Sequence, residues 1–515
     1  MNLTLREKIG QRLVVGFPGI KIDNELEELI REYKISNIIL FKNNIESGPQ
    51  LKKLCKDLQS LIKKHTGRGA FIAIDQEGGM VTRLEKDSVN IPGAMAIAAT
   101  GKPEYAYQAG KITGQQLNRL GINFNLAPVV DINCNMDNPV IGVRSYGDCP
   151  NKVAEYAVAM TRGLLEGGVM SAAKHFPGHG DTNVDSHLGL PQINKTLEEL
   201  QKGELVPFKA VIEAGVPAIM TAHILFPELE SNQLPATMSK KIIKDLLKEQ
   251  MGYKGLVLSD CMEMQAIQKF YGTVEGVKLA MMAGVDLIFI SHTAKLVKEA
   301  SDALLEAFQI GELSIEEMDL SIEKILCCKE KFADNFDTEI KFDEKAGKEY
   351  AYQLLKESIT PVQMPTKSFP KLGDNPLFIG SLPFRSTNVS NINDDTLNFP
   401  KFMANRFGGQ GTIISANPAE KEIEKVLKEA KIYSSVVIGT YNGHLYEGQL
   451  ELVRKAAMKN TNVIVIALRN PYDLRNLPES VYGIAIYEYT LNSFIALTEL
   501  FEKPYELNGV LPVMM

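Results

Sequence analysis

Short apolar runs rich in β-branched residues alternate with longer amphipathic segments between residues 13 and 291. Runs of this length, bounded by turn-forming residues, predict buried strands. They cover residues 13–17, 37–41, 70–75, 124–130, 171–175, 218–223, 256–260 and 286–291. The segments between them carry helix signals, such as the 239–247 stretch with its Ser/Thr cap.

Strands that alternate with helices predict a parallel sheet. Eight such repeats predict an α/β protein with a closed (β/α)8 barrel of the TIM type. Polar residues stand at the ends of the predicted strands and not at their starts, namely Asp75, Asp131, Lys174, His175, His223 and Asp260. The carboxyl ends of the strands form the active-site face of such barrels, so these residues are the first candidates for chemistry.

The pattern changes after the eighth predicted strand. Residues 293–355 are predicted to be helical, and residues 360–373 lose all periodicity. We expect a catalytic barrel over 1–335, a helical connector and linker over 336–373, and a smaller α/β sandwich domain over 374–515. The strands expected in that domain cover 377–380, 412–415, 435–439, 463–468 and 482–487, with helices over 418–430, capped by Asn417, and over 448–459.

Composition narrows the class of protein. The chain of 515 residues is too long for one hydrophobic core, and its 45% hydrophobic and 23% charged content is typical of a folded globular protein. A net charge of −7 argues against a nucleic-acid partner. The first residues are charged where a leader needs apolar ones, and no apolar run is long enough to span a membrane. We expect a cytoplasmic protein with scattered, reduced cysteines.

One segment concentrates titratable side chains. Residues 174–187 hold three of the seven histidines, two acids and a lysine among Pro and Gly residues. Asp185 and His187 are two positions apart and project to the same side of an extended loop, so the acid can orient the imidazole for general acid/base work. Lys174 and His175 end a strand and would donate hydrogen bonds into the barrel mouth. A structural loop contact is the alternative for both pairs.

Other candidates stand at three more strand ends. Asp260 ends the strand at 256–260 and is either a nucleophile or base, or a cap for the next helix. Asp75 and Arg83 flank a Gly-Gly turn, and Arg144 follows the fourth strand. Such acids and arginines clamp hydroxyl groups or form structural ion pairs.

A metal site in the 174–187 segment is a further alternative. Its histidines and acids could act as ligands, but their spacing matches neither a helical zinc motif nor a zinc knuckle. Pro177 and two glycines also prevent the helix that would align His175 with His179. We therefore expect neither a metal nor a cofactor.

Five motifs occur in order along the predicted barrel. They are IDQEGG at 74–79, NPVIGVRSYG at 138–147, KHFPGHGDTNVDSHLGLP at 174–191, PATMS at 235–239, and the SD at 259–260 followed by Met262, Glu263 and Met264. Together they resemble the β-N-acetylglucosaminidases of glycoside hydrolase family 3. The resemblance covers essentially the whole barrel.

This resemblance implies a retaining double displacement in which histidine takes the place of the usual second carboxylate. It implies that Asp260 is the nucleophile and that His187 is the acid/base, with Asp185 as its partner. The residues implied to hold the terminal sugar are Asp75, Arg83, Arg144, Lys174 and His175.

Two departures from the family pattern stand out. Met80 occupies the position at which the family usually continues GGRV, so one rim arginine is missing. Many relatives are a lone barrel, whereas this chain adds a second α/β domain. The family's β-glucosidases generally draw their acid/base residue from that domain, which the Asp185 and His187 loop makes unnecessary here.

The resemblance predicts removal of terminal β-linked N-acetylglucosamine from peptidoglycan fragments or chitin-derived oligosaccharides. Phosphorolysis is the first alternative, because a histidine acid/base does not repel an incoming phosphate as a carboxylate would. A non-catalytic sugar-binding protein and a metal-dependent hydrolase are further alternatives.

Overall fold

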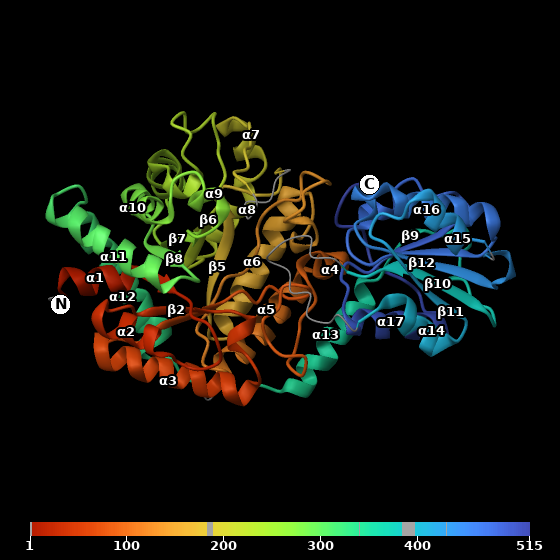
Figure 1. The fold of residues 1–515 in the computed structure, drawn as a ribbon, viewed down its shortest axis with the longest axis horizontal. Coiled ribbons are helices and arrows are strands. Elements are labelled where there is room, and N and C mark those ends of the chain that lie inside the picture. The colour runs from red at the N-terminus through yellow and green to blue at the C-terminus, as the bar shows by residue number, and fades with distance from the viewer. Residues whose placement is uncertain (1–2, 183–188, 339, 384–396, 429) are drawn as a thin grey trace.

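The computed structural model describes residues 3–182, 189–338, 340–383, 397–428 and 430–515. Figure 1 shows a barrel unit, built from the first part of the chain, beside a smaller unit built from the last part. Helix α13 (Glu344–Ser358) leads from one to the other. None of the helices in the described ranges combines the length and apolar character that a membrane span requires.

Within the described residues, eight parallel strands close into a barrel in chain order, because β1 pairs with β8. The strands are β1 (Leu13–Val15), β2 (Asn37–Leu40), β3 (Phe71–Ile74), β4 (Phe124–Asn125), β5 (Met170–Phe176), β6 (Ala218–Thr221), β7 (Leu256–Cys261) and β8 (Leu287–Ile290). They are almost wholly buried, as expected for parallel strands covered on both faces. The predicted (β/α)8 fold is confirmed.

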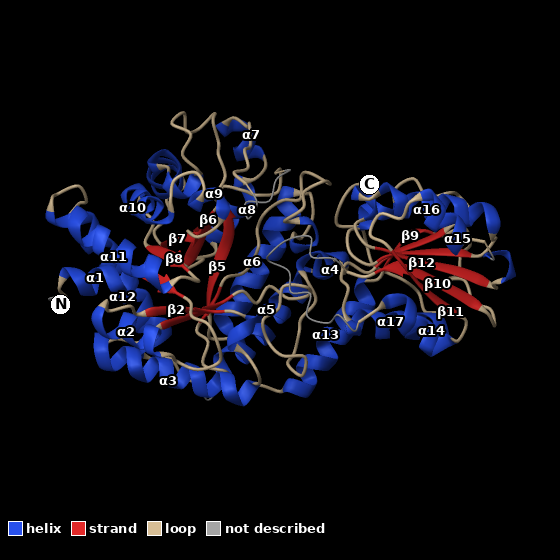
Figure 2. Cartoon of the chain, in the orientation of Figure 1, coloured by secondary structure: helices blue, strands red, loops and turns tan. Residues whose placement is uncertain are grey.

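Helices surround the barrel (Figure 2). They are α1 (Leu5–Arg12), α2 (Asn24–Glu32), α3 (Gly48–Thr66), α4 (Ala94–Ala99), α5 (Pro103–Arg119), α6 (Pro150–Glu166), α7 (Leu197–Lys202), α8 (Leu205–Glu213), the π-helix η4 (Lys241–Gln250), α9 (Gln265–Gln268), α10 (Thr273–Ala283), α11 (Ala294–Gln309) and α12 (Ile315–Lys329). Local sequence sets their ends. In α3, Ser47 accepts the N–H of Gln50 at the start, and Gly67 adopts a left-handed conformation, with φ of 73°, at the end.

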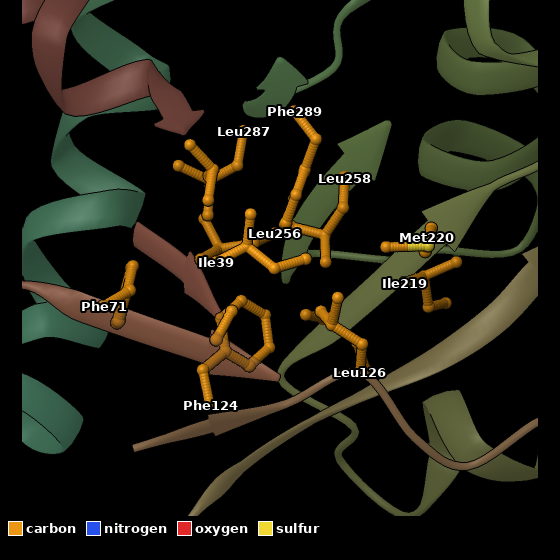
Figure 3. Packing of buried hydrophobic residues seen from close by; sticks show 14 of the residues in the cluster. Ile39, Phe71, Phe124, Leu126, Ile219, Met220, Leu256, Leu258, Leu287 and Phe289 are labelled. Carbon is orange, nitrogen blue, oxygen red and sulfur yellow. The ribbon is translucent and has the colours of Figure 1, made fainter. Parts of the chain in front are cut away.

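The barrel is filled by apolar side chains from neighbouring strands. Figure 3 shows Ile39, Leu126, Leu258 and Phe289 meeting in one cluster, and the rings of Phe71 and Phe124 lie 5.7 Å apart. Ile39, Leu126 and Phe289 also form the apolar floor of a cavity that opens at the carboxyl ends of the strands. The interior of the barrel is therefore a packed core that opens into a site at the carboxyl ends of the strands.

The second domain is a sheet between two layers of helices. Its six described strands run in the order β11-β10-β12-β13-β14-β9, with β9 antiparallel to β14. They are β9 (Thr360–Gln363), β10 (Pro376–Ser381), β11 (Gln410–Ile414), β12 (Ser435–Thr440), β13 (Val463–Ala467) and β14 (Tyr482–Ala485). The helices α15 (Glu420–Val426) and α16 (Glu447–Lys459) cover one face, and α14 (Phe399–Phe407) and α17 (Leu491–Glu502) cover the other (Figure 2).

Three elements differ from the sequence predictions. The run at 124–130 forms only the short strand β4, because Pro128 has no N–H to donate to a regular ladder. The expected linker at 360–373 begins with β9, whose Pro361 is tolerated because β9 is an edge strand. The helix expected at 418–430 begins two residues later as α15, and Asn417 accepts the N–H of Gly448 instead of capping it.

The two domains share an apolar contact. Met95, Ala96 and Ala99 of α4 belong to the same buried cluster as side chains of the second sheet and of α15 and α16. Polar contacts accompany it, since the imidazole of His444 lies 3.1 Å from the carbonyl oxygen of Met136. The second domain therefore packs directly against the loops that follow β3 and β4.

Candidate active site

A cavity of about 770 Å³ opens at the carboxyl ends of the barrel strands. Six of the residues selected from the sequence line it, namely Asp75, Arg83, Arg144, Lys174, His175 and Asp260. Asp75, Arg83 and Arg144 follow β3 and β4, whereas Lys174, His175 and Asp260 lie in the last residues of β5 and β7. The closed barrel therefore brings together side chains that are distant in the chain. The other two selected residues, Asp185 and His187, lie outside the described residues.

A buried network of charges forms one wall of this cavity. The Nζ of Lys174 lies 2.8 Å from Oδ1 of Asp75 and 2.7 Å from Oε1 of Glu77. Arg144 donates two hydrogen bonds to the Glu77 carboxylate, from Nε at 2.8 Å and from Nη2 at 2.7 Å. Nη2 of Arg83 lies 3.8 Å from Oδ2 of Asp75. The network holds the lysine and both arginines in fixed positions, as recognition of hydroxyl groups requires.

Glu77 is the centre of this network, although it was not among the residues expected to act in catalysis or to hold the sugar. Burial raises the pKa of Glu77, but the charges of Arg144 and Lys174 outweigh burial and hold this pKa well below its ordinary range. Glu77 therefore stays ionised at neutral pH. The sequence signal was its place in the IDQEGG motif, two residues after the strand-end Asp75.

His175 is oriented by a buried carboxylate. Asp131 is 1% exposed, and its Oδ2 lies 2.7 Å from Nδ1 of His175. It also accepts the backbone N–H groups of His175 and His179. Burial raises the pKa of Asp131, but His175 and these hydrogen bonds lower it below its ordinary value. The ionised carboxylate fixes the proton of His175 on Nδ1.

His179 has a structural place in the same loop. Burial, together with the nearby His175, lowers the pKa of His179 to about 4, so its ring is neutral near pH 7. Its Nδ1 lies 3.0 Å from the hydroxyl of Thr182.

In the part of the chain that the structure describes, no three acids, histidines or cysteines gather as metal ligands.

Asp260 stands at the end of β7 and is partly exposed to the cavity. Its Oδ1 accepts the backbone N–H of Cys261 at 2.7 Å. The next helix, α9, begins after Met264, so Asp260 does not cap it. The alternative that Asp260 is a helix cap is therefore wrong.

Aromatic side chains also line the cavity. Phe41 and His292, from the ends of β2 and β8, form an aromatic pair with ring centroids 5.0 Å apart. Glu263 lies beside them and accepts the backbone N–H of His292 at 2.6 Å. The lining of the cavity thus contains a charged wall and an aromatic pair, together with Asp260.

The second domain contacts the loop that carries Glu77 and Arg83. Glu488, after β14, accepts the N–H of Gly93 at 3.0 Å, and Gly93 precedes α4 at the end of that loop. Met80 packs against the apolar cluster formed by the second sheet with α14 and α17. A methionine at this position therefore suits a chain in which a second domain covers the loop.

We expect the Glu488→Gln variant to gain stability over the wild type as the pH rises. Burial raises the pKa of Glu488 from 4.5 to about 7, so the folded protein holds this proton more tightly than the unfolded chain. The stability contributed by the neutral carboxyl is complete below pH 4.5 and is lost as the pH rises to about 7. This shift corresponds to about 3 kcal/mol, which the neutral amide does not lose.

Melting temperatures of both proteins, measured from about pH 5 to about pH 8, report this difference. The remaining carboxyl groups titrate in both proteins and cancel in the comparison. A difference in melting temperature that does not change with pH would contradict a buried, titrating Glu488.

A (β/α)8 barrel with paired carboxylates, cations and histidines around a sugar-sized cavity defines a glycoside hydrolase class of site. The profile of the glycosyl hydrolase family 3 N terminal domain matches residues 4–328. The chain belongs to glycoside hydrolase family 3.

Two β-hexosaminidases and one solved structure are among the proteins similar to this chain. β-Hexosaminidase A of Pseudoalteromonas piscicida is 38% identical over 367 residues, which are 64% of this chain and 61% of that protein, so less than two thirds of its length is matched. β-Hexosaminidase of Neisseria meningitidis is 32% identical over 310 residues, 58% of this chain and 82% of that protein. The solved structure of a family 3 β-N-acetylglucosaminidase from Paenibacillus sp. str. FPU-7 superposes with a TM-score of 0.91 at 36% identity, covering 100% of this chain and 99% of that one.

Proposed function

We propose that this chain is a retaining exo-β-N-acetylglucosaminidase that removes terminal β-linked N-acetylglucosamine from peptidoglycan fragments or chitooligosaccharides. The observation that carries the proposal is that Asp260 lines one cavity with Lys174 and Arg144, which are both paired with Glu77. A nucleophile and a rigid set of hydroxyl-binding groups in one cavity are what glycosyl transfer needs. The similarity to β-hexosaminidases supports the choice of sugar.

In the first step, Asp260 attacks the anomeric carbon and the glycosidic oxygen leaves with a proton from His187. This forms a covalent glycosyl-enzyme and releases the aglycone. In the second step, His187 takes a proton from water, which displaces Asp260 and restores the original configuration. Asp185 orients His187 in both steps. The backbone N–H of Cys261 donates to Oδ1 of Asp260 and orients the carboxylate.

The charged wall and the aromatic pair of the cavity suit the two parts of the substrate, the terminal sugar and the aglycone. The terminal sugar occupies the charged wall, where Lys174, Arg83 and Asp75 reach its hydroxyl groups. The aglycone lies on the rim formed by Phe41 and His292, because aromatic faces pack well against the C–H surface of a sugar ring.

Product analysis tests this function. Purified protein is incubated with chitobiose and, separately, with N-acetylglucosaminyl-N-acetylmuramic acid, each with and without inorganic phosphate. Proton NMR during the first turnovers is expected to show free β-N-acetylglucosamine at a rate that phosphate does not change.

Each other outcome has its own meaning. Sugar 1-phosphate as the product would replace hydrolysis with phosphorolysis, and the α-anomer as the first product would rule out a retaining mechanism. If the protein binds both disaccharides and converts neither, it is a sugar-binding protein. Activity that disappears on chelation and returns with a divalent cation would favour the metal-dependent alternative.

A further inference from the structure

His223 and the PATMS motif have no part in the mechanism so far, although both lie next to the strand that carries Asp260. His223 follows β6 and is 1% exposed. Its Nε2 lies 3.0 Å from the carbonyl oxygen of Cys261. A carbonyl oxygen only accepts hydrogen bonds, so Nε2 carries a proton and donates it.

The other side of the imidazole is held by the PATMS motif. Nδ1 of His223 lies 2.9 Å from the hydroxyl of Thr237. This hydroxyl donates to Nδ1, since the ring proton is on Nε2. Thr237 stands in a short turn, Ala236–Met238, which is tied to the chain after β6, since Ala236 donates its N–H to Ile224 and Thr237 donates its backbone N–H to Ala222. Both ring nitrogens therefore have fixed partners, and the imidazole cannot turn without losing one of them.

Cys261 connects this imidazole to the candidate nucleophile. Its carbonyl oxygen accepts from His223, and its N–H donates to Oδ1 of Asp260 at 2.7 Å. The backbone of a single residue thus joins the ring to the carboxylate. A shift of this backbone would move the carboxylate oxygen that Cys261 holds.

Beyond Leu258, the sheet holds β7 by backbone pairing only on its β8 side, where Cys261 pairs with Phe289. The regular pairing of β6 with β7 ends at Leu258, and the pairing of β7 with β8 shifts register between Leu258 and Cys261. Side-chain hydrogen bonds replace the backbone pairing on the β6 side. The hydroxyl of Thr221 donates to the carbonyl oxygen of Leu258, and Nε2 of His223 donates to that of Cys261. On the β6 side, the last residues of β7 therefore depend on side-chain bonds to β6 and to the chain that follows it.

We propose that His223, held by Thr237, is a positioning residue that fixes the carboxylate of Asp260 through the backbone of Cys261. This inference rests on the proposed role of Asp260 as nucleophile. A nucleophile must lie within a fraction of an ångström of its attacking position, and a displacement of about 1 Å costs about 100-fold in rate. The PATMS motif supplies the second anchor of the ring.

The experiment compares His223→Leu with His223→Gln on 2,4-dinitrophenyl β-N-acetylglucosaminide, whose leaving group needs no proton. His223→Leu removes the donor to Cys261 and is expected to lower kcat by about 100-fold, with KM and the inhibition constant of free N-acetylglucosamine changed by less than about threefold. Glutamine carries an N–H close to the position of Nε2, so His223→Gln is expected to recover at least about tenfold of this loss.

Thr237→Val provides an independent variant if His223→Leu does not fold. This variant removes the hydroxyl that holds Nδ1 of His223, at a residue that does not line the cavity. It is expected to lower kcat by about tenfold. Thr161→Val is the matched control, because Thr161 is a buried threonine of α6 whose hydroxyl has no hydrogen-bond partner among the described residues. Thr161→Val is expected to leave kcat and KM unchanged.

Two outcomes would overturn the inference. In the first, His223→Leu and Thr237→Val keep the wild-type kcat. In the second, they lose kcat only in proportion to a fallen melting temperature and a weakened affinity for N-acetylglucosamine, as a general structural defect would produce. Failure of the proposed function gives a different result, because the wild type would then not hydrolyse the aryl glycoside or Asp260→Ala would retain full activity.

Discussion

Asp260→Ala is expected to lower kcat on an aryl β-N-acetylglucosaminide by about 10⁴-fold or more, because no carboxylate remains to form the glycosyl-enzyme. Asp260 is partly exposed at the cavity and does not cap a helix, so its removal leaves the barrel core intact. The melting temperature of the variant is therefore expected to stay within a few degrees of the wild type. Initial rates and thermal unfolding of both proteins measure the two effects.

Sodium azide separates a missing nucleophile from a damaged site. The alanine leaves room for a small anion, which attacks the anomeric carbon from the same side as the carboxylate would. We expect azide to restore turnover and to give the α-glycosyl azide, because only one displacement then occurs. If Asp260→Ala stays fully active, or if azide yields the β-product, Asp260 is not the nucleophile.

Glu77→Ala is expected to destabilise the protein by about 3–5 kcal/mol, because it leaves two buried cations without their shared carboxylate. Lys174 is 2% exposed and Arg144 is 6% exposed, so water cannot replace Glu77. The depressed pKa of Glu77 means that its contribution is present above the ordinary value of 4.5 and is lost as the pH falls through its folded-state pKa. Unfolding by urea near pH 7 measures the effect, and activity is expected to fall with it because Lys174 loses its position.

Glu85→Ala is the matched control for this variant. Glu85 also pairs with a lysine, Lys42, at 2.6 Å, but these two side chains are 27% and 31% exposed. An ion pair that water reaches contributes less than about 1 kcal/mol. If Glu77→Ala and Glu85→Ala lower the free energy of unfolding by the same amount, the buried Glu77 network stabilises the protein no more than an exposed ion pair does.

Much of the site could be predicted because its residues stand at strand ends. Once the alternating pattern predicts a parallel barrel, Asp75, Lys174 and Asp260 fall on one face without any knowledge of their contacts. Asp131 and His223 stand at strand ends too, but a strand-end position does not say whether a side chain faces the cavity or another side chain. Their partners, His175 and Cys261, belong to neighbouring strands.

The weaker predictions concern features that local sequence does not encode. β9 exists because β14 offers an edge to which a short, proline-containing segment can pair. Asn417 does not cap α15 because the N–H of Gly448, which lies 31 residues further along the chain, competes for its side chain. In both cases a partner far away in the sequence overrides the local preference.

The periodicity of apolar residues was enough to predict the barrel, the second α/β domain and the face on which the candidate residues gather, because each depends on a pattern repeated within a short segment. Tertiary structure alone decided that Glu77 joins Lys174 to Arg144, that Glu488 reaches the loop after β3, and that His223 holds Cys261. Such contacts join residues from different strands or domains. Their energies come from burial and from distances of about 3 Å, which exist only after the barrel has closed and the second domain has packed against it.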